Sequence, residues 1–377
     1  MTKKRVLILA YSHLNSDPRI KNQIVALQND YEVVCAGNSP LDSSILKYYP
    51  IRYTLKFSIS RKLSRLFLFL FKRYDSYYWH ESRLKFIQSL ENEEFDLIIA
   101  NDIGTLPLAF KIASQNTKIY FDAHEYHPKE FEDSFKWRIM HQGLTKYLCK
   151  KYIPKTDFFT TVCDSIAEEY AINYKKKPKV ITNTTKFQDL SPTLVKKGGI
   201  RIIHHGAAIP SRKIENMIKM MEHVDKRFSL DLMLVGDKAY IKKLKTQAES
   251  LENVNFIPPV EQENIAKHIN QYDLGIYILQ PTNFNNLNAL PNKIFDFIQA
   301  RLGIVISPNP EMKSLVEKYA IGKVAKDYSI DSMAKLLNSI TSEDVSSYKD
   351  SSHKIAKEVS SEANIEKIKQ HVKQLLE

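Results

Sequence analysis

Short runs of β-branched and aliphatic residues alternate along the chain with polar segments of helical length. Buried strands that alternate with helices are typical of a parallel sheet that helices cover on both faces. In the first half of the chain this pattern predicts strands at 5–10, 32–36, 96–100, 118–122, 158–162 and 179–183. Ser16-Asp17-Pro18 follows the first of these runs and predicts a helix start, because Asp17 can cap a helix and Pro18 can begin one.

The alternation pauses over residues 187–199, where Ser191-Pro192 and Gly198-Gly199 interrupt any periodicity. A second series then predicts strands at 200–204, 230–236, 253–257, 273–279, 303–307 and 322–325. We therefore predict two domains of the Rossmann-like, doubly wound α/β class. Their expected ranges are 1–187 for the N-terminal domain, 188–199 for a linker and 200–359 for the C-terminal domain.

The last segment, 360–377, predicts an amphipathic helix whose apolar side needs a surface to cover, and we expect it to pack back on the first domain. Ligands of open parallel sheets bind outside the carboxyl ends of the strands. Two such domains that face one another would enclose a cleft, so functional residues are expected directly after strands.

The composition fits a chain with two cores, because 377 residues of which 43% are hydrophobic can bury more than one. No stretch approaches the roughly 18 apolar residues of a membrane-spanning helix. The apolar run 6–10 is too short for a signal peptide, so a cytoplasmic protein is expected. Cys35, Cys149 and Cys163 are scattered, which favours reduced core thiols over disulfides or a metal site.

The formal charge is +12, carried mainly by residues 1–187, and it predicts a polyanionic partner. Residues 56–79 combine Arg61, Lys62, Arg65, Lys72 and Arg73 with many aliphatic and aromatic side chains. A helix there would be amphipathic with cationic flanks, which favours the surface of an anionic membrane over nucleic acid. The alternative is a core helix whose basic side chains reach out to solvent.

The segment 288–296, with the sequence NALPNKIFD, leaves a predicted strand and enters a predicted helix. Unpaired N–H groups at a helix start bind phosphate, and Asn292 and Asp296 share one helix face. A carboxylate in that position can bond a ribose diol while the helix start holds a diphosphate. The alternative is an ordinary helix start with a polar cap.

Two further segments follow strands. Residues 204–216 form a small-residue loop that leads to a helix start carrying Arg212 and Lys213, where a guanidinium can lie against a diphosphate. Residues 120–127 place two histidines and two acids in one loop, which is compatible with acid–base or metal chemistry. The chain has no Asp-x-Asp pair, and we expect no metal and no cofactor.

These segments resemble the retaining glycosyltransferases of family 4, a GT-B fold family, in the branch typical of bacterial surface polysaccharides. Residues 288–296 resemble the family's E-x7-E region, residues 206–212 its G-R-x-x-x-x-K loop and residues 122–125 its D-A-H-E loop. Asn288 stands at the first acidic position. Ala207 stands where the family has an arginine, and Lys213 or Lys293 would compensate for that missing cation.

The resemblance implies which residues carry the reaction. His124, Arg212 and Asn288 would be catalytic, and Arg19 and Asn183 would lie on the acceptor side. The nucleotide base would meet the loop around Pro258, and residues 289–292 would hold the sugar and diphosphate. The implied donor-binding residues are Gly206, Arg212, Lys213, Pro258, Leu290, Asn292, Lys293 and Asp296.

We therefore expect an enzyme that moves a hexose-type sugar from a nucleotide diphosphate sugar to a glycan or polyprenyl-linked glycan acceptor, with retention of configuration. It would act in cell-surface polysaccharide synthesis, in the cytoplasm or on the inner face of the plasma membrane. The alternatives are a GT-B sugar-nucleotide epimerase and a non-catalytic nucleotide-sugar-binding protein. A glycosidase is disfavoured because no pair of facing carboxylates is evident.

Overall fold

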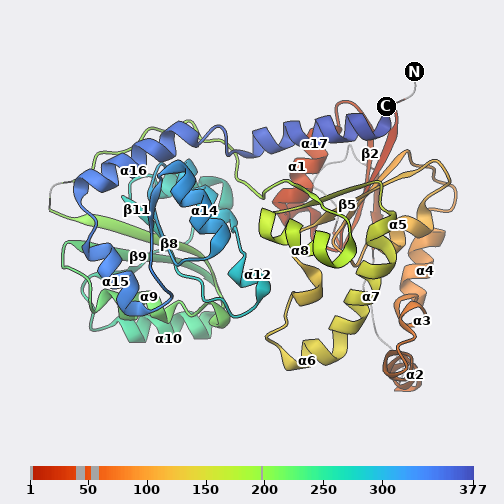
Figure 1. Ribbon diagram of the computed structural model, residues 1–377, viewed down its shortest axis with the longest axis horizontal. Coiled ribbons are helices and arrows are strands. Elements are labelled where there is room, and N and C mark those ends of the chain that lie inside the picture. Colours follow the sequence, from red (N-terminus) through yellow and green to blue (C-terminus); the bar gives the residue numbers. More distant parts are fainter. Residues whose placement is uncertain (1–2, 40–46, 52–58, 197) are drawn as a thin grey trace. The chain divides into compact units, whose positions relative to one another are not determined.

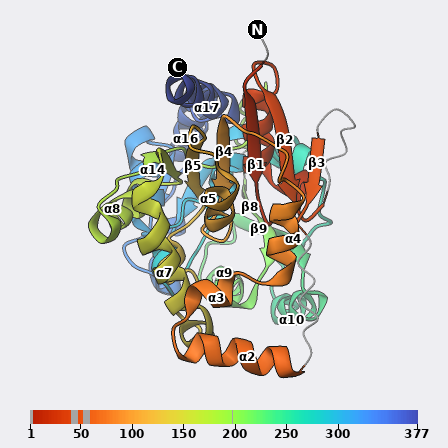
Figure 2. The same ribbon diagram turned by 90° about the vertical axis from the view of Figure 1, so that its right-hand side faces the viewer.

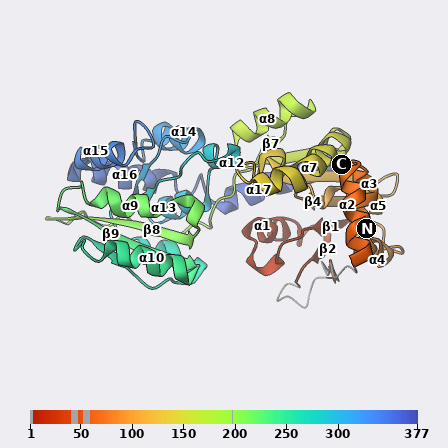
Figure 3. The same cartoon turned by 90° about the horizontal axis from the view of Figure 1, so that it is seen from below.

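The chain folds into two compact α/β units, seen here in a computed structural model that describes residues 3–39, 47–51, 59–196 and 198–377. The side chains of Ser16 and of residues 59–63 are outside this description. The first unit comprises Met1–Thr182 together with Asn364–Glu377, and the second comprises Asn183–Ala363. Each unit is an open parallel sheet with helices on both faces, the architecture that the hydrophobic pattern predicts (Figure 1, Figure 3).

The sheet of the first unit has seven parallel strands in the order β3-β2-β1-β4-β5-β6-β7. The predicted strands are all found, and the structure adds the edge strand β3, whose sequence KYYP carries no aliphatic run. The strands are β1 (Arg5–Leu9), β2 (Glu32–Gly37), β3 (Lys47–Pro50), β4 (Leu97–Asn101), β5 (Lys118–Ala123), β6 (Phe158–Thr161) and β7 (Lys179–Val180).

The helices of this unit cover the sheet, and α1 begins at the capping residue expected from the sequence. Asp17 accepts hydrogen bonds from the backbone of Arg19 and Ile20, which confirms the predicted start of α1. The helices are α1 (Pro18–Leu27), α2 (Ile59–Leu70), α3 (Tyr74–Tyr78), α4 (Glu81–Gln88), α5 (Leu106–Ile112), α6 (Phe135–Trp137), α7 (Gly143–Tyr152), α8 (Asp164–Tyr174) and the C-terminal α17 (Ser361–Leu376).

The C-terminal helix α17 packs on the first sheet although it is the last element of the chain (Figure 1). Ile368 and Val372 are buried in one cluster with Val6 and Ile8 of β1. The ring of His371 lies 4.8 Å from that of Phe158. The apolar side of this helix thus completes the core of a unit that is built mainly from the first half of the sequence.

The sheet of the second unit has six parallel strands in the order β10-β9-β8-β11-β12-β13. They are β8 (Ile200–Ala208), β9 (Phe228–Gly236), β10 (Val254–Phe256), β11 (Leu274–Tyr277), β12 (Gly303–Ile306) and β13 (Gly322–Val324). Each predicted strand of this half is present. One buried cluster lies on each face of the sheet, so both faces exclude water.

Helices α9, α10 and α15 contribute to one of these clusters, and α11, α13 and α14 contribute to the other. Within the segment 288–296, Pro291 is the N-cap and α13 begins at Asn292. The helices are α9 (Glu215–Met221), α10 (Lys238–Ala248), α11 (Ile265–Ile269), α12 (Phe284–Leu287), α13 (Asn292–Gln299), α14 (Pro310–Tyr319), α15 (Ile330–Asn338) and α16 (Ser342–Ile355).

Each sheet has one point at which the strand order reverses. In the first unit β1 lies between β2 and β4, and in the second unit β8 lies between β9 and β11. The loops that follow the two central strands at such a point diverge to opposite faces, which opens a crevice at the carboxyl edge of the sheet. The fold therefore directs attention to the residues that follow β1 and β4, and β8 and β11.

Gly275 in β11 allows α13 to lie directly on this second sheet. A Cβ atom at this position would lie 2.3 Å from Cγ of Phe297, a distance that no real structure tolerates. Gly275→Ala is therefore expected to lower the free energy of unfolding by about 1 to 3 kcal/mol through overpacking. Gly199→Ala is the control, because its Cβ would meet its nearest atom at 3.6 Å. Chemical denaturation of both variants checks this, and an equal loss of stability would contradict it.

Candidate functional site

The candidate donor site lies at the carboxyl edge of the second sheet, where β8 and β11 reverse the strand order. His204, His205 and Gly206 lie near the carboxyl end of β8, and Tyr277 is the last residue of β11. Helix α13 brings Lys293 and Asp296 to the same place. These residues come from three separate segments of the second unit, and the fold alone brings them together.

Lys293 is the most unusual group of this site. Its side chain is only 7% exposed, and its ammonium nitrogen has no hydrogen-bond partner among the residues that the structure describes. The ammonium lies 4.1 Å from the centre of the Tyr277 ring, a cation–π contact that offsets part of the lost hydration. Burial and the neighbouring Arg212 lower the pKa of Lys293 to about 7. A buried cation in this condition is poised to accept an anion.

Gly206 provides the space that the ammonium of Lys293 occupies. Its φ of +124° belongs to a region that residues with a side chain rarely adopt. A Cβ at position 206 would also lie 3.2 Å from the lysine nitrogen. The glycine is thus required twice, for the turn of the backbone and for the close approach of Lys293.

The remaining cations of the predicted donor loop differ in their placement. Arg212 ends the short 3-10 helix Pro210–Arg212, is half-buried, and lies near enough to Lys293 to disfavour its charge. Lys213 is exposed, with a left-handed backbone at φ +53°. The sequence left open whether Lys213 or Lys293 replaces the cation missing at Ala207, and the burial of Lys293 beside Gly206 favours Lys293.

Asp296 faces His205 on the buried side of α13. The carboxylate oxygen Oδ2 lies 3.4 Å from Nε2 of His205, and both side chains are almost fully buried. Burial raises the pKa of Asp296 to about 7, an effect that Lys293 opposes. Burial and Lys293 lower the pKa of His205 to about 3, so this imidazole is neutral. His204 donates from Nδ1 to the carbonyl of Ile276 and has a structural place in the sheet.

The other predicted donor residues line the same edge with different degrees of burial. Asn288 is buried, and its amide donates to the carbonyl of Phe284 at 2.9 Å, which closes the end of α12. Leu290 and Asn292 are half-buried at the start of α13, which no side chain caps. Pro258 is exposed in the loop after β10. The start of α13 thus keeps the backbone donors that bind phosphate.

In the first unit, Arg19 and Asp122 form the centre of a buried polar network. The guanidinium of Arg19 binds both carboxylate oxygens of Asp122, with Nε to Oδ2 at 2.6 Å, and Nη1 donates to the carbonyl of Ile181 at 2.7 Å. Gln23 and Thr160 also donate to Asp122. The sequence assigned Arg19 to the acceptor side, yet its donors are engaged within the network. Its structural role here is to join α1, β5 and the end of β7.

His124 follows β5 in the loop that the sequence singled out. Its side chain is 24% exposed, and Nε2 lies 3.3 Å from Oδ1 of Asn101. Asn183, the other predicted acceptor-side residue, is half-buried at the beginning of the second unit. The structure adds Asp102, which the sequence reasoning did not single out and which contacts both histidines of the predicted loop, His124 and His127. The signal in the sequence that could have identified Asp102 is an aspartate directly after a strand.

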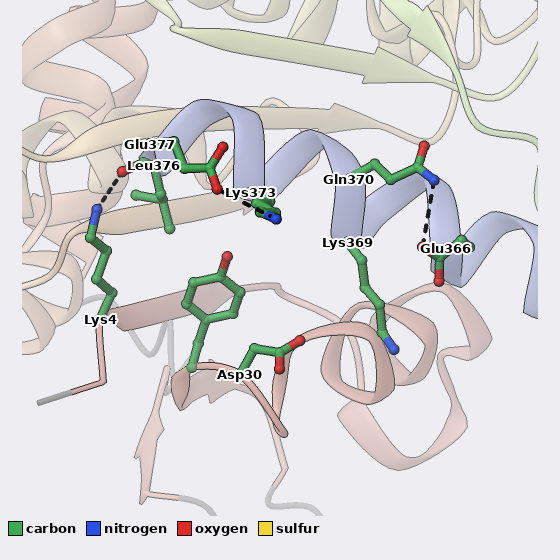
Figure 4. A pocket seen from close by; sticks show the side chains of 9 residues that line it. Lys4, Asp30, Glu366, Lys369, Gln370, Lys373, Leu376 and Glu377 are labelled. Atoms are coloured by element: carbon green, nitrogen blue, oxygen red, sulfur yellow. Dashed lines mark hydrogen bonds and ion pairs between the residues drawn. The ribbon is translucent and has the colours of Figure 1, made fainter. Parts of the chain in front are cut away.

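Two pockets lie in the first unit, away from these residues. One, of about 580 Å³, lies beside α17 and is lined by Lys4, Lys369 and Lys373 together with acidic side chains (Figure 4). The other, of about 490 Å³, lies between α2 and α4. Among the described residues, no group of three or more His, Cys, Asp or Glu side chains could hold a metal ion. No helix in the described part of the chain is long and apolar enough to cross a membrane.

The comparison with known families bears on the second unit. Residues 186–362 match the family described as Glycosyl transferases group 1. The match spans nearly the whole unit that carries Lys293, Asp296 and Arg212. No curated protein matches the chain in sequence.

Solved structures match both units. Sucrose-phosphate synthase from Thermosynechococcus elongatus matches with a TM-score of 0.72 and 13% identity, over 99% of each chain. Anabaena Alr3699/HepE in complex with UDP-glucose matches with a TM-score of 0.69 and 14% identity, over 98% of this chain and 99% of its own. A mutant of S. aureus TarM in complex with fondaparinux, alpha-GlcNAc-glycerol and UDP matches with a TM-score of 0.59 and 15% identity. That match covers 77% of this chain and only 58% of TarM. These likenesses show that the chain has the GT-B fold.

The shifted pKa of Asp296 generates a prediction about stability. Since its pKa rises from 3.8 to about 7 on folding, the folded chain holds a proton there between these values that the unfolded chain has lost. Stability therefore falls as the pH rises through this range, and at pH 8 a buried carboxylate is ionised. Asp296→Asn removes this pH dependence, so the stability of the variant relative to wild type should rise by on the order of 2 kcal/mol between pH 5 and pH 8.

Thermal unfolding at the two pH values measures this difference. Asp237→Asn is the matched control, because Asp237 is an exposed N-cap of α10 and asparagine caps equally well. An Asp296→Asn variant whose difference from wild type is the same at both pH values would show that the carboxylate is not buried in its charged form.

Proposed function

We propose that this chain is a glycosyltransferase that moves a hexose-type sugar from a nucleotide diphosphate sugar to a glycan or polyprenyl-linked glycan acceptor. The observation that carries the proposal is the buried, unpartnered ammonium of Lys293 at the reversal point of the second sheet. The match of residues 186–362 to glycosyl transferases of group 1 supports the reaction class. The bound UDP or UDP-glucose of similar structures supports uracil as the first base to test.

In this proposal the diphosphate lies at the start of α13, where Lys293 and Arg212 balance its charge. Asp296 takes the ribose hydroxyls, and the base lies against the loop around Pro258. An anion beside Lys293 favours the charged ammonium, so binding of the diphosphate restores a proton that burial disfavours.

The reaction breaks the bond between the anomeric carbon and the phosphate oxygen, and a bond to the acceptor oxygen forms on the same face. The acceptor proton passes to the leaving diphosphate, so no protein nucleophile is needed and configuration is retained. Negative charge grows on the diphosphate as the bond breaks, and fixed cations stabilise that charge most in the transition state. Lys293 and Arg212 supply them, and no metal is required in this scheme.

A non-catalytic nucleotide-sugar-binding protein is the second candidate. The observation that favours it is Asn288, an amide at the position where the resembling family has a carboxylate, already bonded to the carbonyl of Phe284. A sugar-nucleotide epimerase would use the same donor. Product analysis with and without acceptor separates the three, because only a transferase needs the acceptor and only an epimerase converts the donor alone.

The donor site can be tested with single substitutions. Arg212→Ala is expected to lower turnover by roughly 2 to 4 kcal/mol of transition-state stabilisation. Lys293→Met, which keeps the buried stem, is expected to weaken UDP binding by about tenfold or more, because a charge-assisted contact is lost. Lys213→Met is the control, because Lys213 is exposed and should change neither quantity more than about threefold.

Binding is measured by thermal shift with UDP, GDP, CMP and ADP and their sugars, since a bound ligand raises the melting temperature by mass action. A wild-type chain that none of these stabilises would overturn the proposal. Equal losses in the Lys213 and Lys293 variants would instead reject the assignment of Lys293.

We further propose that the acceptor side works at an anionic membrane surface, through α2. Leu66, Phe67 and Leu70 are exposed on this helix and Phe71 directly after it, and the rings of Phe67 and Phe71 lie 4.2 Å apart. Figure 2 shows α2 away from the strands of its own unit. An apolar helix surface of this kind, followed directly by cations, is typical of a segment that lies in the membrane interface.

The cations of the predicted strip are not equivalent. Lys72 and Arg73 are exposed next to the apolar surface, whereas Arg65 donates to the carbonyl of Tyr77 and lies over the Tyr77 ring. Residues 52–58 and the side chains of 59–63 are outside the described part of the chain, so the predicted contributions of residue 56, Arg61 and Lys62 rest on the sequence alone. The exposed pair Lys72 and Arg73 is therefore the one to test.

Flotation with vesicles of equimolar phosphatidylglycerol and phosphatidylcholine tests this surface. Wild type is expected to float, and both Leu70→Ser/Phe71→Ser and Lys72→Gln/Arg73→Gln should lose most of the bound fraction, at about 1 kcal/mol per cation. Phe135→Ser is the control, since Phe135 is equally exposed on α6. Recovery of both double variants at the wild-type level would reject the membrane surface.

A further inference from the structure

Asp102 follows β4 directly, at the reversal point of the first sheet. Its φ of +65° places it in the left-handed region, which is strained for a residue with a side chain. Its backbone N–H donates to the carbonyl of Asp122 at 2.9 Å, which ties this strained turn to the end of β5. Such strain persists where the surroundings impose it, and here it directs the carboxylate at the loop that contains His124.

The carboxylate of Asp102 contacts two histidines of that loop. Oδ1 accepts from the backbone N–H of His124 at 3.3 Å and lies 3.2 Å from Nε2 of His127. Oδ2 lies 3.7 Å from Nδ1 of His124. On the other side of the ring, Nε2 of His124 lies 3.3 Å from Oδ1 of Asn101. Side-chain oxygens of two successive residues, Asn101 and Asp102, therefore lie beside the two ring nitrogens of His124, and Oδ2 of Asp122 lies 3.8 Å from Nε2.

The second histidine, His127, contacts the carboxylate of Asp102 as well. It is buried, and its Nδ1 lies 3.4 Å from Oε2 of Glu130. Burial by itself would lower the pKa of His127, but the carboxylates of Asp102 and Glu130 raise it to about 10. Burial by itself would raise the pKa of Asp102, but His124 and His127 together lower this pKa well below its usual range. Asp102 thus faces His124 as a permanent carboxylate.

Asp102 differs from the other carboxylate of this region. Asp122 is fully buried and is satisfied by Arg19, Gln23 and Thr160, so its role is structural. The side chain of Asp102 is 45% exposed at the carboxyl edge of the sheet. A carboxylate that only joined two loops would have no reason to stay accessible at the edge where ligands of such sheets bind.

We propose that Asp102 is a positioning residue for the reaction: it orients the His124 imidazole through its contacts with Nδ1 and the backbone N–H, and His127 contacts the same carboxylate. This inference rests on the proposed function, because it takes His124 as the group that meets the acceptor and the sugar. An ionised partner on one ring nitrogen fixes the direction in which the other can act, as second-sphere carboxylates do for histidines elsewhere.

The decisive experiment measures three variants: Asp102→Asn, His124→Ala and the double variant that combines these two changes. Glu130→Gln alone is measured as the control. Asp102→Asn is expected to lower kcat by about tenfold or more with less than about a twofold change in donor KM. In the His124→Ala background it should add nothing, because it acts through that ring. Glu130→Gln is the matched control: it removes a carboxylate from His127 without touching His124, so it should lower the melting temperature and leave kcat unchanged.

Two results would overturn the proposal. One is a loss of kcat on Asp102→Asn that is as large in the His124→Ala background as in wild type. The other is a Glu130→Gln variant with the same losses of kcat and melting temperature as Asp102→Asn. That result would mean that Asp102 only stabilises the loop and does not orient His124.

A readout without turnover separates failure of the inference from failure of the proposed function. The ring ¹⁵N resonances of His124, assigned by their absence in His124→Ala, should shift in Asp102→Asn and not in Glu130→Gln. If wild type transfers no sugar but these resonances respond as expected, the positioning contact stands and the proposed reaction fails. If transfer is found and the resonances do not respond, only the inference fails.

Discussion

Helix α13 carries two ionisable side chains into the interior of the second unit because two glycines allow it to lie directly on the sheet. Gly275 admits the ring of Phe297, and Gly206 admits the ammonium of Lys293. With any larger residue at position 275, α13 would have to move away from the sheet, and with one at position 206 the ammonium of Lys293 would have to shift. Lys293 and Asp296 would then reach solvent, and their pKa values would return toward their ordinary ranges. The electrostatic character of the donor site is thus a consequence of close packing between one helix and two strands.

The two units solve the problem of buried charge in opposite ways. In the first, Arg19 and Asp122 satisfy one another with help from Gln23 and Thr160, which makes a rigid centre below the sheet edge. In the second, the cation of Lys293 is left without a hydrogen-bond partner. An unsatisfied buried cation reduces stability in the absence of ligand, and such a group is expected where an anion is to be bound. The contrast supports a donor in the second unit and a supporting, positioning role for the polar residues of the first.

The loops of the first unit show how local strain and buried charge cooperate. The left-handed backbone at Asp102 is held by its bond to β5, and the charge of His127 keeps the Asp102 carboxylate ionised. Neither the left-handed backbone nor the charged contact buries additional apolar surface. Both fix one exposed side chain, His124, whose position the helix and strand packing would otherwise leave to a loop.

The sequence by itself determined the doubly wound class of both units, nearly every strand, and the segments after strands that hold the candidate functional residues. It did so because alternation of apolar runs and turn residues records burial directly, and because parallel sheets bind ligands at one edge. The edge strand β3 was not predicted, because its sequence KYYP lacks that apolar run. Tertiary structure alone decided that Lys293 and not Lys213 reaches the space beside Gly206. It also decided that the guanidinium of Arg19 is bound to Asp122 and that Asp102 faces His124. Each of these depends on contacts between segments tens of residues apart, and the hydrophobic pattern of one segment carries no information about which side chain of another it will meet.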